Sequence, residues 1–137
     1  MSVENVETVG SFYELLNQGE IDGALQLLPP DAVLDGSRLI NPDLKGIHRG
    51  RDEIRPLLER FTEAWEELEW VAEDYIEIGD DVIRIGGIRA RGIGSGVDVG
   101  ARGAQLWRFR DGDPVLVEFF QDKNEALEAA GAGESAE

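Results

Sequence analysis

The 137-residue sequence contains no cysteine, a single histidine and only two lysines. The absence of cysteine excludes a disulfide framework, a thiolate zinc site and a cysteine nucleophile. No apolar run approaches the roughly 20 residues that a membrane-spanning helix needs, so no membrane is expected as a partner. The N-terminus lacks a basic stretch followed by an apolar one, and we therefore expect no signal peptide and a cytoplasmic location.

Basic residues are also scarce relative to acidic ones. The sequence has 13 Lys and Arg residues against 29 Asp and Glu residues, which gives a net charge of −16. Such a surface repels phosphate groups and therefore disfavours nucleic acids and anionic membranes as partners. The excess of arginine over lysine is typical of a GC-rich bacterial genome. His, Asp and Glu nowhere cluster at metal-ligand spacing, so we expect no metal and no other cofactor.

Apolar residues, by contrast, are sufficient for a core. They make up 42% of the chain, which argues against wholesale disorder. The length is that of one domain, which we place over residues 1–131. Residues 132–137 are small and polar, and we expect them to form a frayed tail.

Helical spacing of apolar residues dominates the first half of the chain. It predicts helices over residues 3–17 and 21–28, and a third that begins near Asp52 and runs to Trp65. Asp52 is the expected N-cap of this third helix. A short strand over residues 31–35 and an irregular stretch over 36–49 separate the second and third helices.

After the third helix the apolar period changes to two, which predicts strands. Gly86-Gly87 lies inside one of these strands and predicts a bulge or bend. Helices followed by consecutive strands indicate an α+β fold with helices on one face of a curved antiparallel sheet. The predicted extended segments are residues 68–78, 82–91, 97–110 and 115–121, followed by a terminal helix over 123–130.

Several segments of this sequence are similar to one known family. The order of elements resembles the SnoaL-like branch of the nuclear transport factor 2-like superfamily over nearly the whole chain. The resemblance implies a cone-shaped α+β barrel of the ketosteroid isomerase type, with a hydrophobic small molecule in its cavity. It also implies a homodimer, formed through the opposite sheet face where Leu106, Leu116 and Phe120 alternate. The segments that carry the resemblance are Asn17–Gly23, Pro30–Val33, His48–Ile54, Trp107–Gly112 and Glu125–Gly131.

The resemblance does not specify an activity, because this cone hosts isomerases, dehydratases, hydrolases, cyclases and plain binding modules. Comparison with ketosteroid isomerase places Phe12 at its tyrosine donor, Gly36 near its general base and Gln105 at its protonated aspartate. All three positions depart from that enzyme. A cofactor-independent isomerase, cyclase or hydrolase therefore stands beside a second hypothesis, a non-catalytic binding or dimeric assembly domain.

Asp35 and His48 are the residues expected to carry any acid–base chemistry. Histidine is the one side chain with an unperturbed pKa near neutrality, and beside Asp35 it would form a base dyad. The structural alternative makes Asp35 a turn residue before Gly36 and Ser37. In that alternative His48 packs a loop at the start of the third helix.

Five residues are predicted to contact the ligand. Gln105 and Trp107 share a strand face and would suit a planar molecule with a carbonyl or hydroxyl group. Arg89 would favour an anion inside the cavity, whereas on the outer face it would pair with carboxylates. Tyr13 and Trp65 lie on helical apolar faces, where core packing is the alternative to ligand contact.

Overall fold

The computed structural model describes residues 2–39 and 45–131. The predicted tail, residues 132–137, and part of the predicted irregular stretch, residues 40–44, lie outside the described residues. No helix in the described ranges is long and apolar enough to cross a membrane. The elements are α1 (Ser2–Asn17), α2 (Ile21–Gln26), β1 (Val33–Asp35), β2 (Ile47–Arg49), α3 (Arg51–Glu63), β3 (Trp65–Ile78), β4 (Asp81–Gly92), β5 (Asp98–Arg110), β6 (Asp113–Phe120) and α4 (Lys123–Ala129).

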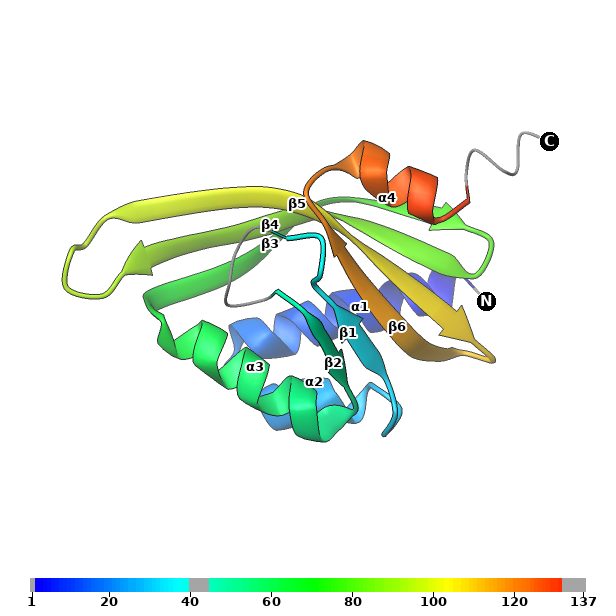
Figure 1. Ribbon diagram of the computed structural model, residues 1–137, viewed down its shortest axis with the longest axis horizontal. Helices are drawn as coiled ribbons and strands as arrows, with labels where there is room; N and C mark the ends of the chain where they lie inside the picture. Colours follow the sequence, from blue (N-terminus) through cyan, green and yellow to red (C-terminus); the bar gives the residue numbers. More distant parts are fainter. Residues whose placement is uncertain (1, 40–44, 132–137) are drawn as a thin grey trace.

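The strands form one six-stranded curved sheet in the order β2-β1-β6-β5-β4-β3, which confirms the predicted α+β class. One detail of the prediction is wrong: β1 pairs parallel with β6, so the sheet is mixed and not wholly antiparallel. The chain passes from β1 through β2, α3, β3, β4 and β5 before β6 returns beside it, which permits this parallel pairing. Helices α1, α2 and α3 lie on one side of the sheet and α4 on the other (Figure 1).

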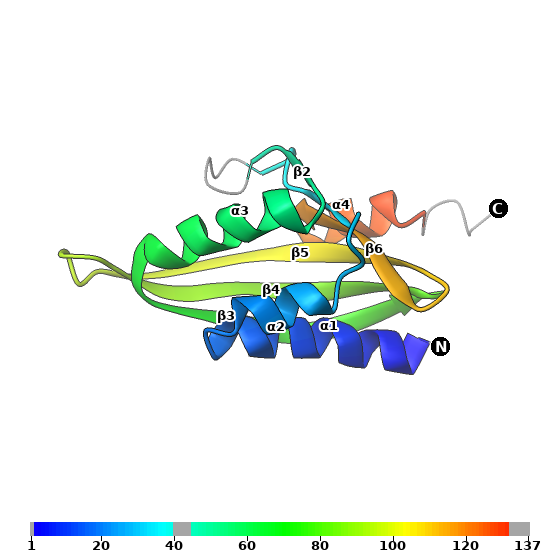
Figure 2. The same ribbon diagram turned by 90° about the horizontal axis from the view of Figure 1, so that it is seen from below.

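Figure 2 shows α1, α2 and α3 lying over one face of the sheet, here called the inner face. This face carries the larger core. Buried apolar side chains recur at helical spacing on α1 and α3 and at every second position on the strands, as expected. Asn17 fastens the end of α1 to β3, because its amide both donates to and accepts from the Trp70 backbone, at 3.0 and 2.7 Å. The main inner-face residues are Val9, Phe12, Tyr13, Leu16, Ile54, Leu57, Phe61, Trp70, Val82, Trp107, Val117 and Phe119.

The opposite sheet face, here called the outer face, is partly covered by α4. Leu106 and Phe120 are buried there in a second apolar cluster together with Ala126 of α4. The sequence analysis offered Leu106 and Phe120 as a dimer surface, and this is wrong because α4 of the same chain occupies them. Arg108 anchors the helix: it donates to the carbonyl of Ala129 at 2.5 Å.

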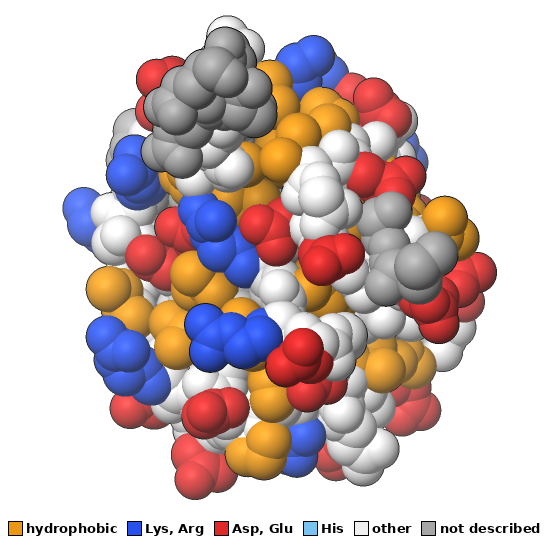
Figure 3. All heavy atoms as spheres, turned by 90° about the vertical axis from the view of Figure 1, so that its right-hand side faces the viewer, with side chains coloured by type: hydrophobic (Ala, Val, Ile, Leu, Met, Phe, Trp, Pro, Cys, Tyr) orange, Lys and Arg blue, Asp and Glu red, His pale blue; other side chains and the backbone are white. Residues whose placement is uncertain are grey.

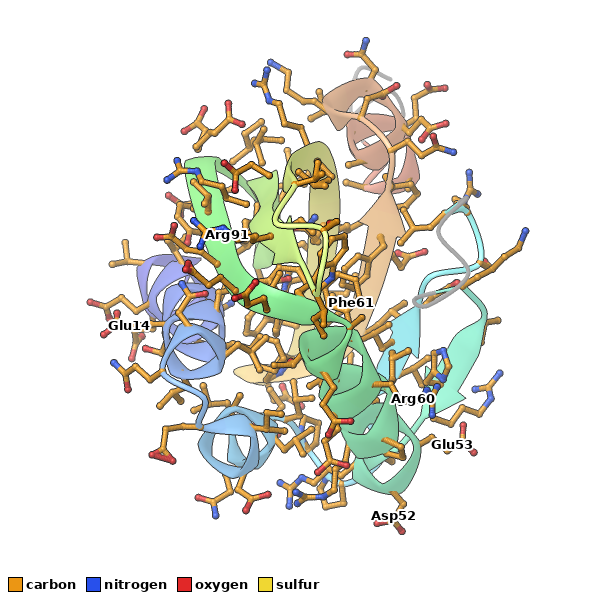
Figure 4. The ribbon with its side chains drawn as sticks, turned by 90° about the vertical axis from the view of Figure 1, so that its left-hand side faces the viewer. Glu14, Asp52, Glu53, Arg60, Phe61 and Arg91 are labelled. Atoms are coloured by element: carbon orange, nitrogen blue, oxygen red, sulfur yellow. The ribbon has the colours of Figure 1, made fainter. Side chains whose placement is uncertain are left out.

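The start of α3 differs from the prediction. The N-cap is Gly50, at φ 79°, and not Asp52. Glu53 instead accepts a hydrogen bond from the Arg49 amide at 2.8 Å. Asp52 lies in the first turn, where a carboxylate still favours the positive end of the helix. Figure 4 shows Asp52 and Glu53 at the outer end of α3 and Phe61 turned toward the sheet.

Glycines allow the central strands to approach closely. A Cβ on Gly86 would lie 2.2 Å from the carbonyl oxygen of Val71, and one on Gly87 would lie 1.8 Å from that of Ala101. No side chain fits at either distance. The register between β3 and β4 shifts beside this point, which confirms the irregularity predicted from Gly86-Gly87.

The end of the molecule that carries α4 has a mixed surface. Acidic, basic and apolar side chains are interspersed there, with no broad field of one sign (Figure 3). The acidic excess of the sequence is therefore partly offset locally by arginines, such as Arg108, which contacts Glu118 at 2.9 Å.

Substitution of Gly87 by alanine tests the close approach of β4 and β5. We expect Gly87→Ala to lower the free energy of unfolding by about 1–3 kcal/mol, since the new methyl group overpacks the strand pair. Gly100→Ala is the matched control, because a Cβ there meets nothing within 4 Å. Urea denaturation measures both variants, and equal stabilities would contradict the strand geometry.

Candidate functional site

A cavity of about 260 Å³ opens between α3 and the sheet. Its walls are mainly apolar and aromatic, and the glycines of the close strand approach form one side. Phe61 reaches it from α3, pointing toward the sheet (Figure 4). The lining residues are Leu39, Phe61, Trp70, Gly86, Gly87, Ile88, Ala101, Arg102, Gly103, Gln105, Phe119, Phe120 and Gln121.

The lining contains no acidic residue among the described residues, although the chain as a whole is strongly acidic. Its one charged member is Arg102, whose Nε donates to Glu73 at 2.8 Å and whose side chain is 77% exposed. The deeper polar group of the lining is Gln105, which is only 4% exposed. Gln105 is therefore the side chain that would determine how a ligand is oriented.

Behind Gln105 lies Arg84, a completely buried arginine on β4. Its Nη1 donates to Oε1 of Gln105 at 2.6 Å, and its Cζ lies 3.9 Å from the centre of the Tyr13 ring. Its Nε and Nη2 have no hydrogen-bond partner within the described ranges. Burial of a charge without an opposite charge costs several kcal/mol as an order of magnitude, so this arrangement calls for an explanation.

Arg84 fixes the orientation of the Gln105 carboxamide. A guanidinium group only donates hydrogen bonds, so the amide oxygen must face it. The amide nitrogen then faces the glycine-lined side of the cavity. It lies 3.4 Å from the carbonyl oxygen of Gly86, a weak contact, and 4.0 Å from where a Cβ on Gly103 would be. Gln105 therefore presents a hydrogen-bond donor toward the cavity.

Tyr13 of α1 is the third member of the buried polar group that contains Gln105 and Arg84. It is 4% exposed, and its hydroxyl accepts a hydrogen bond from Nε1 of Trp107 at 3.3 Å. Burial raises the pKa of Tyr13 to about 12, although the positive charge of Arg84 and the hydrogen bond from Trp107 act in the opposite direction. The phenol is therefore neutral at physiological pH, and its ring contacts Arg84 as a cation–π partner.

The structure does not bring Asp35 and His48 together. His48 pairs with Leu34 across β1 and β2, and Leu34 precedes Asp35 in the chain. Because successive side chains of a strand point to opposite faces, Asp35 and His48 lie on opposite faces. Asp35 accepts hydrogen bonds from the amide and hydroxyl of Ser37, at 2.9 and 2.6 Å, as in the turn alternative. His48 Nε2 lies 3.3 Å from the carbonyl oxygen of Lys45.

Gln105 is the one predicted ligand residue that lines the cavity. Trp107 is fully buried in the core. The prediction that Trp65 lies on a helical face is wrong: α3 ends at Glu63, and Trp65 begins β3, paired with Gly92 and away from the lining. Trp70, further along the same strand, provides the indole of the cavity wall. Alternation along strands identified the inner-facing positions, but it could not say which of them packs and which borders open space.

Arg89 lies on the outer face, outside the cavity. It is 72% exposed and contacts Glu69 of β3 at 3.5 Å. Arg89 therefore follows the second of the two predicted possibilities, in which it lies on the outer face and pairs with carboxylates. The buried cation at this site is instead Arg84, which sequence reasoning missed. Its signal was a lone charged residue in the apolar stretch Val82–Ile88, in phase with the inward-facing positions.

No group of three or more His, Cys, Asp and Glu side chains in the described ranges is arranged to hold a metal ion.

Comparison with known proteins gives one family and one fold. A family model described as SnoaL-like domain matches residues 9–117. The comparison with curated proteins gave no match.

Solved structures share the fold at low sequence identity. A protein of unknown function from Burkholderia pseudomallei, described as NTF2-like, is 23% identical; the alignment covers 91% of this chain and 95% of that one, with a TM-score of 0.74. TerC, co-crystallized with polyporic acid, is 20% identical over 93% and 97%, with a TM-score of 0.75. A ketosteroid isomerase-like fold protein from Catenulispora acidiphila, in complex with trimethylamine, is 15% identical over 91% and 92%, with a TM-score of 0.72.

Titration of Tyr13 tests the buried polar group. In a Tyr75→Phe variant Tyr13 is the only tyrosine, and we expect its ultraviolet absorbance change to have a midpoint near pH 12. Because the unfolded phenol ionises near pH 10, stability from this burial is complete below about pH 10 and is lost as the pH rises toward 12. A midpoint near 10 in the folded protein would contradict the burial of Tyr13 beside Arg84.

Proposed function

The chain belongs to the SnoaL-like domain family, and on that premise we propose that it binds a small, largely apolar molecule in the cavity beside Gln105. The observation that carries this proposal is an open cavity of about 260 Å³ with aromatic walls and one oriented donor. Such a combination of apolar walls and few fixed polar groups is typical of small-molecule sites.

The size of the cavity suits a compact ligand. A closed apolar cavity of about 150 Å³ holds one benzene molecule, so this space accepts a molecule of about two rings. Phe61, Trp70 and Phe119 offer aromatic faces on which a planar body would pack. Two structures that share the fold were solved with small organic molecules, polyporic acid and trimethylamine.

Binding is favoured over acid–base catalysis by what lines the cavity. Gln105 and Arg102 supply hydrogen-bond donors, but no Asp, Glu or His lines it among the described residues. Transfer of a proton needs a titratable group within hydrogen-bond reach of the reacting atom. A cofactor-independent isomerase, cyclase or hydrolase that uses Asp35 and His48 therefore stays a prediction, and those two residues would have to act separately.

Dimeric assembly is the second candidate. On the outer face Glu67 and Glu69 of β3 lie beside Arg91 and Arg89 of β4 as exposed ion pairs. The acidic row on β3 and the basic row on β4 can pair with the same rows of a second copy. A two-fold axis between the two copies would place the acidic row of each against the basic row of the other. Three exposed apolar side chains, Ile93, Val97 and Val99, lie near the β4–β5 turn, but Val99 pairs with the buried Ala90 and faces the side opposite to these ion pairs.

A blocked cavity tests ligand binding. We expect the neutral fluorescent probe 1-aminoanthracene to bind the unmodified protein, and Ala101→Trp to weaken this binding by about tenfold or more, because the indole fills the space between the walls. Ala101 is an exposed lining residue, so the substitution does not disturb the buried core.

Val99→Trp is the matched control for this test. Val99 is exposed on the same strand, two residues away, and does not line the cavity. Its variant should bind the probe like the unmodified protein. Absence of probe binding to the unmodified protein, or equal binding by both variants, would contradict the proposed site.

Light scattering after gel filtration tests the assembly. We expect a mass near twice the 15.1 kDa of one chain, and a lower apparent mass for Arg89→Glu, because this substitution places a negative charge in the basic row that meets the acidic row of the second copy. Val3→Glu is the control, since Val3 is similarly exposed but lies on α1. A single chain mass for the unmodified protein would exclude this assembly.

A further inference from the structure

Arg84 combines complete burial with the absence of a nearby opposite charge. On the inner face its cross-strand neighbours are Tyr75 on β3 and Gln105 on β5, and neither is an anion. The aromatic ring that it contacts, Tyr13, is neutral at physiological pH. No Asp or Glu of the described residues forms an ion pair with Arg84 within 4.0 Å, although this chain has 29 acidic residues.

A purely structural role does not account for this cation. The contact with Tyr13 and the hydrogen bond to Gln105 use one ring face and one nitrogen of the guanidinium. Two more nitrogens remain without partners in the described part of the chain. An apolar side chain of similar volume would fill this place without the cost of burying a charge. The charge itself therefore needs a partner that residues 2–39 and 45–131 do not supply.

Gln105 transmits the electrostatic effect of Arg84 to the cavity. The hydrogen bond of 2.6 Å polarises the carboxamide, so that its NH₂ group becomes a stronger donor toward the cavity. This effect is large because both side chains lie in a medium of low polarity. At the cavity wall, Arg102 is paired with Glu73, so the uncompensated positive charge near the cavity is that of Arg84.

We infer that the cavity selects a small organic anion, whose carboxylate or enolate oxygen accepts a hydrogen bond from Gln105 and compensates the buried charge of Arg84. This inference rests on the proposed function and specifies its ligand class. The apolar walls hold the body of the molecule, and the single oriented amide fixes one oxygen. A phosphate group fits poorly, because its three charged oxygens would meet only one deep donor.

A matched ligand series on the unmodified protein tests the inference. The probes are 2-naphthoate, its neutral analogue 2-naphthamide and the cation 2-naphthylmethylammonium, which share one ring system and differ in charge. We expect 2-naphthoate to bind about tenfold or more tightly than 2-naphthamide, because hydrogen bonds to charged groups are the stronger ones. The cation should bind most weakly. Calorimetry, or quenching of the tryptophan fluorescence to which the cavity residue Trp70 contributes, gives the dissociation constants.

Two variants assign the selectivity to its source. Arg84→Met removes the charge with a side chain of similar length, and Gln105→Glu replaces the donor by a carboxylate that pairs with Arg84. Both should weaken 2-naphthoate binding by about tenfold and change 2-naphthamide binding by less than about threefold. Arg91→Met is the control: it removes one exposed arginine from the same strand and should leave both affinities unchanged. Circular dichroism verifies that each variant is folded.

The outcomes separate the inference from the proposed function. If 2-naphthoate binds no better than 2-naphthamide, or if Arg84→Met and Arg91→Met weaken it equally, the anion inference fails while cavity binding stands. If 1-aminoanthracene binds but no naphthalene compound does, the inference also fails. If neither 1-aminoanthracene nor any naphthalene compound binds, both fail. The ligand series needs no variant, so misfolding of Arg84→Met leaves the test intact.

Discussion

The close approach of the central strands is the constraint on which the rest of this structure depends. Gly86, Gly87 and Gly103 lie where neighbouring carbonyl oxygens leave no room for a Cβ. With side chains at these positions β4 could not approach its neighbours, and the sheet could not bend there. The same three glycines border the cavity. The feature that curves the sheet therefore also leaves space between the sheet and α3.

The positive charge of Arg84, buried inside the curved sheet, determines the chemistry that the cavity offers. Arg84 holds the carboxamide of Gln105 in one orientation, and Tyr13 covers the guanidinium from the side of α1. The group is positively charged, and the described side chains that contact Arg84 are neutral. Burial of this charge is unfavourable in isolation, and the proposed anionic ligand would offset that cost.

The resemblance to ketosteroid isomerase, as drawn from the sequence, implies that Gln105 takes the position of a protonated aspartate of that enzyme. An aspartic acid donates a hydrogen bond only while it keeps its proton, whereas an amide donates at every pH. The hydrogen bond from Arg84 supplies the polarity that an acidic donor would otherwise provide. This arrangement favours recognition of an anionic oxygen without a titrating acid, consistent with binding as the function of the cavity.

Sequence alone determined the order of elements apart from β2 (Ile47–Arg49), which lies in the stretch predicted to be irregular. The other elements were predictable because apolar periods of 3.6 and 2 report which side of a helix or strand faces a core. It also located Gly86-Gly87 and the inward-facing side of Gln105. It did not give the parallel pairing of β1 with β6, the cover that α4 places over the outer face, or the separation of Asp35 from His48. Those depend on contacts between segments distant along the chain. Arg84 is the clearest case: its residue type is visible in the sequence, but only the tertiary structure buries it completely, with no ion pair to a carboxylate of the described residues.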